Sequence, residues 1–169
     1  MQGRMIYEKN IFFCSDDDLA AFFGVGCSFF TNDTVSVQTN YSLFASVDDC
    51  GEKSELTIHH TGGDYRIRYQ EPDSLAGFEE YYTMDENGQW QIELNYQGLS
   101  MSIKDASLLK SSVGNDIVAS LQDAQTKNQR EISGITEEGS YILKLDSDGY
   151  PSKLSIPQQD LTVTFEAEK

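Results

Sequence analysis

From residue 34 onward, apolar and polar residues alternate along the chain in short runs. A two-residue period is typical of a β-strand with one face in a core and the other in water. The runs cover residues 41–47, 55–60, 65–70, 90–96, 99–103, 141–145, 154–156 and 161–165. Alternation of this kind is the signature of antiparallel sheets, and it predicts about eight or nine strands in one meander.

The residues between these runs favour tight turns. Asparagine, aspartate and glycine tolerate the positive φ angles that type I′ hairpins need. Three dipeptides supply them, Gly62-Gly63, Asn87-Gly88 and Asp148-Gly149. Pro151 and Pro157 flank a short run and indicate an edge strand or a strand end. The turns support a meander of hairpins.

One segment, residues 105–126, has helical periodicity instead. Its apolar residues recur at intervals of three and four, and Asn115 is the predicted cap of a helix from Asp116 to Gln125. The repeating residues are Leu108, Leu109, Val113, Ile117, Val118, Leu121 and Ala124. The predicted fold class is therefore α+β, mainly antiparallel β, with one main helical insertion and a single domain over residues 34–169.

The first 33 residues are irregular and carry a different candidate feature. An apolar run at residues 11–13 and an acidic cluster at residues 16–18 precede Val25-Gly26-Cys27. Small residues directly before a cysteine resemble the end of a bacterial lipoprotein signal, which would make Cys27 the lipidated residue. The alternative is an ordinary N-terminal helix or a start codon placed too early.

The charge balance excludes several partner classes. The chain of 169 residues carries 12 Lys and Arg against 28 Asp and Glu, a net charge of −16. Such an acidic chain is a poor ligand for nucleic acid or for anionic lipid headgroups, since both need basic surfaces. No apolar run is long enough to span a bilayer. Membrane attachment is therefore expected only through a lipid anchor, and a protein partner is expected to offer a basic patch.

Candidate catalytic and metal-binding residues form no convincing set. His59 and His60 are adjacent on a predicted strand, so they point to opposite faces and cannot share a metal ion. Glu71, Glu79 and Glu80 are the nearest approach to a paired-carboxylate arrangement, but acidic neighbours are common on so acidic a chain. We therefore expect a non-enzymatic protein without metal or cofactor.

Residues 64–78 form the most specific stretch, reading DYRIRYQEPDSLAGF. A strand that ends at Glu71-Pro72 and a turn through Gly77 are followed much later by the hairpin sequence Gly149-x-Pro151-x-Lys153-Leu154. Together these features resemble the LolA-like envelope proteins of bacteria, most closely the GerS-like branch of germination lipoproteins in Firmicutes. The resemblance implies a curved, half-open barrel whose concave face is apolar, and a location outside the cytoplasm.

On this resemblance, the concave face is the candidate ligand-binding surface. Its predicted members are Tyr65, Ile67, Tyr69, Trp90, Ile92 and Leu94. The alternative is that these six side chains are plain core.

Three functions stay open. The GerS-like branch implies a lipoprotein that binds or regulates a partner protein, such as a cell-wall amidase of the cell or spore envelope. LolA itself implies a carrier that holds a lipid, an acyl chain or a lipoprotein in an apolar cavity. The third is a secreted acidic β-domain that only shapes a surface.

Overall fold

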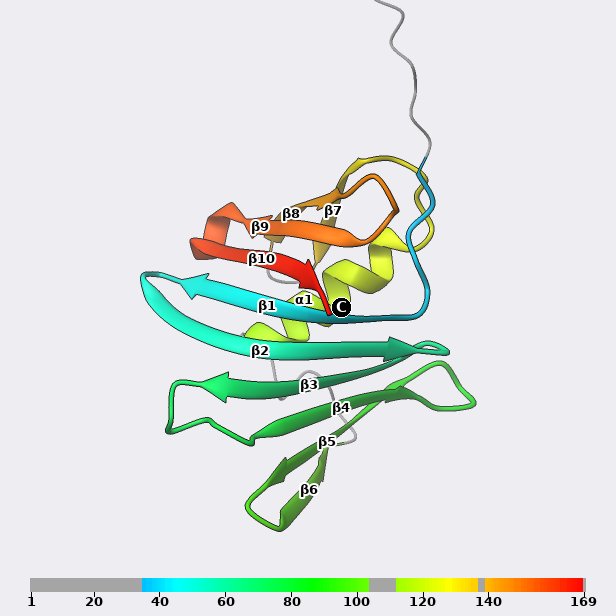
Figure 1. Ribbon diagram of the computed structural model, residues 1–169. Coiled ribbons are helices and arrows are strands. Elements are labelled where there is room, and N and C mark those ends of the chain that lie inside the picture. Colours follow the sequence, from blue (N-terminus) through cyan, green and yellow to red (C-terminus); the bar gives the residue numbers. More distant parts are fainter. Residues whose placement is uncertain (1–34, 104–111, 137–138, 169) are drawn as a thin grey trace, which may run out of the picture. The chain divides into compact units, whose positions relative to one another are not determined.

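The computed structural model describes residues 35–103, 112–136 and 139–168 (Figure 1). The chain divides into two compact units, residues 1–31 and 32–169, and all described residues belong to the second. Cys27 and the other features of the first 33 residues lie outside the described residues. Within the described part, no helix is both long and apolar enough to cross a bilayer.

The second unit is built on one antiparallel sheet of ten strands. The first six are β1 (Tyr41–Asp49), β2 (Glu52–Thr61), β3 (Asp64–Glu71), β4 (Glu79–Met84), β5 (Trp90–Tyr96) and β6 (Leu99–Ile103). The last four are β7 (Glu131–Thr136), β8 (Gly139–Leu145), β9 (Pro151–Ile156) and β10 (Leu161–Ala167). A short 3-10 helix, η2 (Pro157–Gln159), joins β9 to β10. The predicted α+β class is confirmed.

The sheet consists of two meanders joined through the strands nearest the two ends of the chain. The strand order is β6-β5-β4-β3-β2-β1-β10-β9-β8-β7, so β1 and β10 are neighbours (Figure 1). Ala45 lies opposite Phe165 and Val47 opposite Val163, which places apolar pairs on one face of this junction. The sheet is open, with β6 and β7 as its edge strands.

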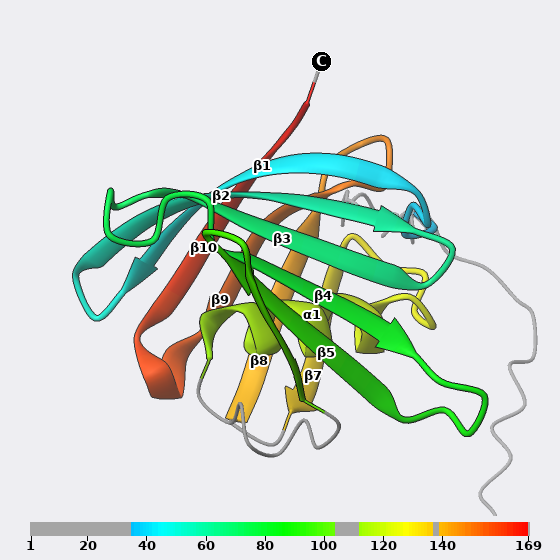
Figure 2. The ribbon, with the colours of Figure 1, turned by 90° about the horizontal axis from the view of Figure 1, so that it is seen from below.

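The helix α1 (Val113–Ala124) lies along the concave side of the curved sheet (Figure 2). Ile117, Val118, Leu121 and Ala124 are at most 2% exposed and pack into the core. The predicted cap at Asn115 is wrong. Ser112 is the N-cap, and its Oγ accepts the Asn115 backbone N–H at 3.0 Å. Asn115 lies in the first turn and donates its backbone N–H to this cap. Serine and asparagine are about equally favourable as N-caps, so residue type alone does not decide between them.

The sequence pattern did not predict two of the strands, because each has a residue at an inward position that interrupts the apolar alternation. Strand β4 turns Glu80 and Tyr82 inward, and a carboxylate at a core position hides the apolar alternation. Strand β7 turns Ile132 and Gly134 inward. A side chain at Gly134 would overlap the Tyr141 ring and the Asp123 carboxylate. Both strands are recognisable only once their neighbours are in place.

The turn predictions hold in part. Gly62 and Gly63 have φ of +64° and +100° and form the two-residue turn between β2 and β3, as predicted. Asn87-Gly88 instead belongs to a longer loop, in which the Asp85 carboxylate accepts the Asn87 and Gln89 backbone N–H groups. A side chain that binds these donors stabilises a wider turn than the predicted type I′ hairpin.

Candidate functional site

The six predicted concave-face residues all lie on the inward side of the sheet. Tyr65, Ile67, Tyr69 and Ile92 are buried, with at most 7% of their surface exposed. Trp90 and Leu94 are partly buried and pack against the same core. Because α1 packs against the middle of this face, side chains occupy the space that a broad carrier cavity would need. Space for a ligand therefore has to be sought at the ends of the face.

A cleft of about 380 Å³ opens where the β1–β2 hairpin faces the loop between β3 and β4. Its apolar wall consists of Tyr69, Pro72, Leu75, Phe78 and Val113. Its polar rim consists of Asp49, Glu52, Lys53 and Ser54. Tyr69 is the one predicted concave-face residue among them. The cleft is thus apolar on one side and charged on the other.

The apolar wall depends on a compact loop over residues 72–78. The Tyr69 N–H donates to the Phe78 carbonyl at 2.9 Å, and the Gly77 N–H donates to the Tyr69 carbonyl at 2.9 Å. Strand β3 ends at Glu71 and Gly77 has a φ of +81°, both as the sequence predicted. The Leu75 N–H also donates to the Pro72 carbonyl at 2.8 Å. These bonds hold the loop's apolar side chains beside Tyr69.

Aromatic contacts extend the wall toward β5. The Phe78 ring centroid lies 5.6 Å from that of Tyr69 and 6.2 Å from that of Tyr96, the second pair in an edge-to-face arrangement. The Tyr96 hydroxyl also donates to the Ser74 carbonyl at 3.2 Å. Rings in such arrangements stabilise one another beyond the burial of their surface. The wall is therefore largely formed before any ligand arrives.

A buried carboxyl group lies directly behind Tyr69. Glu80 is only 4% exposed, and its two oxygens accept the Tyr82 hydroxyl at 2.6 Å and the Tyr69 hydroxyl at 3.4 Å. Burial raises the pKa of Glu80 above its ordinary value, and the two tyrosine hydrogen bonds oppose that rise. Tyr69 thus faces the cleft and also contacts the only glutamate among the buried residues of the described chain.

The first turn of α1 packs onto this carboxyl group. Gly114 is buried, and an added Cβ there would overlap the Glu80 carboxylate and lie 3.0 Å from the Tyr82 hydroxyl. The N-terminus of a helix carries partial positive charge, which favours a nearby carboxylate. Glu80, Tyr82 and Gly114 therefore fix the helix end that supplies Val113 to the cleft.

The two histidines lie on opposite faces, as expected. His59 is on the outward face with its Nδ1 2.7 Å from the Ser42 Oγ. His60 is 1% exposed and stacks on Tyr65 with a centroid separation of 4.2 Å. Burial lowers the pKa of His60. Among the described residues, no three metal-ligating side chains come together.

The glutamates 79 and 80 also point apart. Glu79 lies on the outward face, where its Oε1 pairs with Arg66 Nη2 at 2.7 Å, whereas Glu80 is inside. Adjacent residues of a strand cannot act together on one bond of a substrate. Glu80 is a buried carboxyl group beside an apolar cleft, and two tyrosine hydroxyls donate hydrogen bonds to its oxygens.

Sequence reasoning missed most of the cleft. Pro72, Leu75, Phe78 and Val113 were not among the predicted site residues, although the first three belong to the 64–78 stretch that is the most specific of the sequence. The available signal was a pair of large apolar residues, Leu75 and Phe78, inside a turn. Val113 gave no such signal, because only the packing of α1 brings it to the loop.

No protein family and no curated protein matches this sequence. Among solved structures, the chain is similar to a LolA superfamily protein from Nitrosomonas europaea. The alignment covers 83% of this chain and 86% of that chain, with 9% sequence identity and a TM-score of 0.40.

Proposed function

We propose that this protein is a non-catalytic binding protein that receives an apolar group, the acyl chain of a lipid or a lipoprotein, in the cleft beside Tyr69. The observation that carries the proposal is the preformed apolar wall of Tyr69, Phe78 and Leu75. Leu75 is 39% exposed on this wall, so an apolar group in the cleft could contact it.

The size and chemistry of the cleft fit a single chain. Its volume of about 380 Å³ lies at the lower end of the range for small-molecule sites. Tyr65, Ile67 and Ile92 in the middle of the concave face are buried, so the cleft at its end is the proposed place for one chain. The charged rim from Asp49 to Lys53 would keep a polar headgroup in water, while the apolar tail lies against Tyr69 and Phe78.

A fluorescent acyl probe, dansyl-undecanoic acid, tests this proposal by titration. We expect saturable binding, and a Leu75→Asp variant should bind about tenfold more weakly, because losing about 60 Å² of apolar contact corresponds to about 1.5 kcal/mol. The matched control is Ile135→Asp, since Ile135 is 81% exposed and lies outside the cleft. Absence of saturable binding to the wild-type protein, or equal weakening by both variants, would contradict the proposal.

A second candidate function is binding of a basic protein partner, which the GerS-like resemblance implies as regulation of a cell-wall amidase. The net charge of −16 favours it, since association with a basic surface is accelerated electrostatically and slowed by salt. Among the described residues, β6 pairs with another strand on one side only, and its free edge offers such a partner a place to bind.

We further propose a location outside the cytoplasm, with attachment to the envelope through a lipid on Cys27. The support is the Val25-Gly26-Cys27 sequence. On expression in a bacterial host, we expect the protein in the membrane fraction with the mass of an acylated cysteine, and a Cys27→Ser variant in the soluble fraction. An unmodified Cys27 in a membrane-bound protein would refute this anchor.

A further inference from the structure

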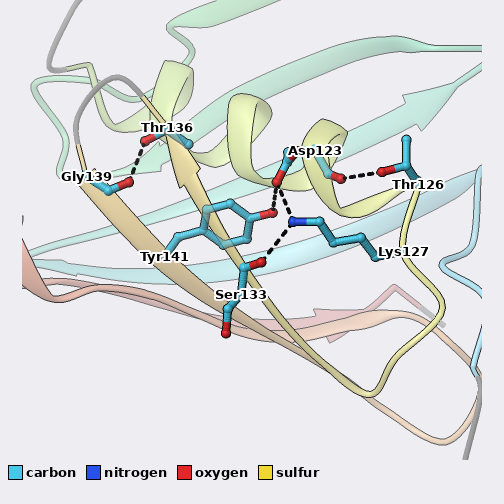
Figure 3. A network of polar contacts seen from close by, with 7 residues as sticks. All are labelled: Asp123, Thr126, Lys127, Ser133, Thr136, Gly139 and Tyr141. Carbon is cyan, nitrogen blue, oxygen red and sulfur yellow. Dashed lines mark hydrogen bonds and ion pairs between the residues drawn. The ribbon is translucent and has the colours of Figure 1, made fainter. Parts of the chain in front are cut away.

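The two edge strands of the sheet differ in how their free backbone groups are treated. At the β7 edge, Lys127 Nζ donates to the Ser133 carbonyl at 2.9 Å and pairs with Asp123 Oδ2 at 2.8 Å (Figure 3). A lysine on an edge strand's backbone hinders the addition of another strand, because its charge would be buried. The β7 edge is thus occupied by a side chain of the same domain.

The position of Lys127 at the β7 edge depends on the packing of β7 against α1. The Tyr141 hydroxyl donates to Asp123 Oδ2 at 2.6 Å, and this contact holds the carboxylate that orients Lys127 (Figure 3). Gly134 leaves room for it, since a Cβ there would overlap both Tyr141 and Asp123. The lysine position therefore follows from several side chains acting together.

Among the described residues, no charged side chain bonds to the backbone of the β6 edge in this way. The strand reads Leu-Ser-Met-Ser-Ile from Leu99 to Ile103 and carries no charge. Leu99 is 77% exposed and Met101 is 61% exposed. Within the described part of the chain, no side chain bonds to the β6 backbone. An uncharged, apolar edge of this kind is a template for pairing with another strand.

The two faces of β6 differ in chemistry. Met101 lies opposite Leu94 and Leu99 opposite Tyr96, so these apolar residues share the inward face. On the outward face, the Ser100 hydroxyl donates to Glu93 Oε1 at 2.9 Å. No described cation pairs with Glu93. A strand added beside β6 would therefore meet apolar side chains on one face and a carboxylate on the other.

We propose that β6 is a docking strand for an extended segment of a partner protein in which apolar and basic residues alternate. The backbone of the segment would pair with the free edge, its apolar residues would cover Leu99 and Met101, and its basic residues would lie near Glu93. A second copy of this chain fits less well, because β6 has no basic residue and each copy carries a net charge of −16. The inference rests on the second candidate function and names its surface.

An eight-residue peptide of alternating valine and lysine, labelled with a fluorophore, is the probe. Binding is measured by anisotropy, and its location by amide shifts of the isotope-labelled protein. We expect shifts centred on β6, binding that weakens with salt, and at least about tenfold weaker binding by Met101→Lys, since an inward charge blocks an edge. The matched control is Ile135→Lys on β7, which is 81% exposed and should bind like wild type.

Further variants and a control peptide distinguish pairing with β6 from other modes of binding. Glu93→Gln should weaken binding less than Met101→Lys and reduce the salt dependence. Equal loss in Met101→Lys and Ile135→Lys, shifts away from β6, or equal binding of a valine–glutamate peptide would overturn the proposal. So would a dimer of the free protein that buries β6. Titration of the same variants with the acyl probe reports on the cleft separately, so failure of one site leaves the other measurable.

Discussion

Replacing Gly114 by valine is expected to destabilise the domain by about 3 kcal/mol, the upper end of the range for overpacking a well-packed core. The new Cβ would overlap the Glu80 carboxylate and lie 2.8 Å from its Cδ. Neither partner moves freely, because Tyr82 and Tyr69 hold the carboxylate by hydrogen bonds and the helix is fixed by its buried face. Urea denaturation measures the free energy of unfolding.

The cause can be isolated with a smaller substitution and a double mutant. Alanine favours helices over glycine by about 1 kcal/mol, so Gly114→Ala would stabilise a helix with free space at this position. We expect Gly114→Ala to destabilise instead, and to do so less when Glu80→Ala is also present, because the overlapping group is then gone. Additive effects of the two substitutions would show that Gly114 and Glu80 do not contact each other in this way.

Replacing Glu80 by glutamine is expected to make the protein more stable at alkaline pH and to change the shape of its stability profile. Burial raises the pKa of Glu80 in the folded state above 4.5. The unfolded chain therefore loses this proton at lower pH than the folded chain. The contribution of Glu80 to stability is fully present below pH 4.5 and is lost as pH rises through the folded-state pKa.

Glutamine has the shape of a protonated glutamate, with one oxygen that accepts and one NH2 group that donates, but it cannot ionise. The free energy of unfolding of Glu80→Gln minus that of wild type should therefore rise with pH above 4.5 and level off beyond the folded-state pKa, with a slope of at most about 1.4 kcal/mol per pH unit. Glu79→Gln is the matched control. Glu79 is paired with Arg66 on the outward face and its pKa is lowered, so it gives no such rise. A flat difference for Glu80→Gln would contradict a buried, destabilised carboxylate.

The sequence by itself determined the class of fold and most of the core. Alternation in residues 41–47, 56–60 and 65–69 identified the inward side chains, because a strand with one wet face must place its apolar residues at every second position. The end of β3 at Glu71 and the turn at Gly77 were also predictable, since proline and glycine restrict or extend the backbone locally. Strand alternation and turn formation depend on residues that are close in the sequence, which is why the sequence alone predicts them.

Only the tertiary structure decided which part of the apolar face borders an open cleft. Periodicity places Ile67 and Tyr69 on the same face, but Ile67 is completely buried in the core while Tyr69 borders the cleft. The cleft joins residues from the β1–β2 hairpin, the 72–78 loop and Val113.

The difference between the two sheet edges was equally hidden. It depends on Lys127, which follows α1, pairs with Asp123 and donates to the backbone carbonyl of Ser133 on a separate strand. Such arrangements depend on which elements pack together, and no local pattern of side chains encodes that choice.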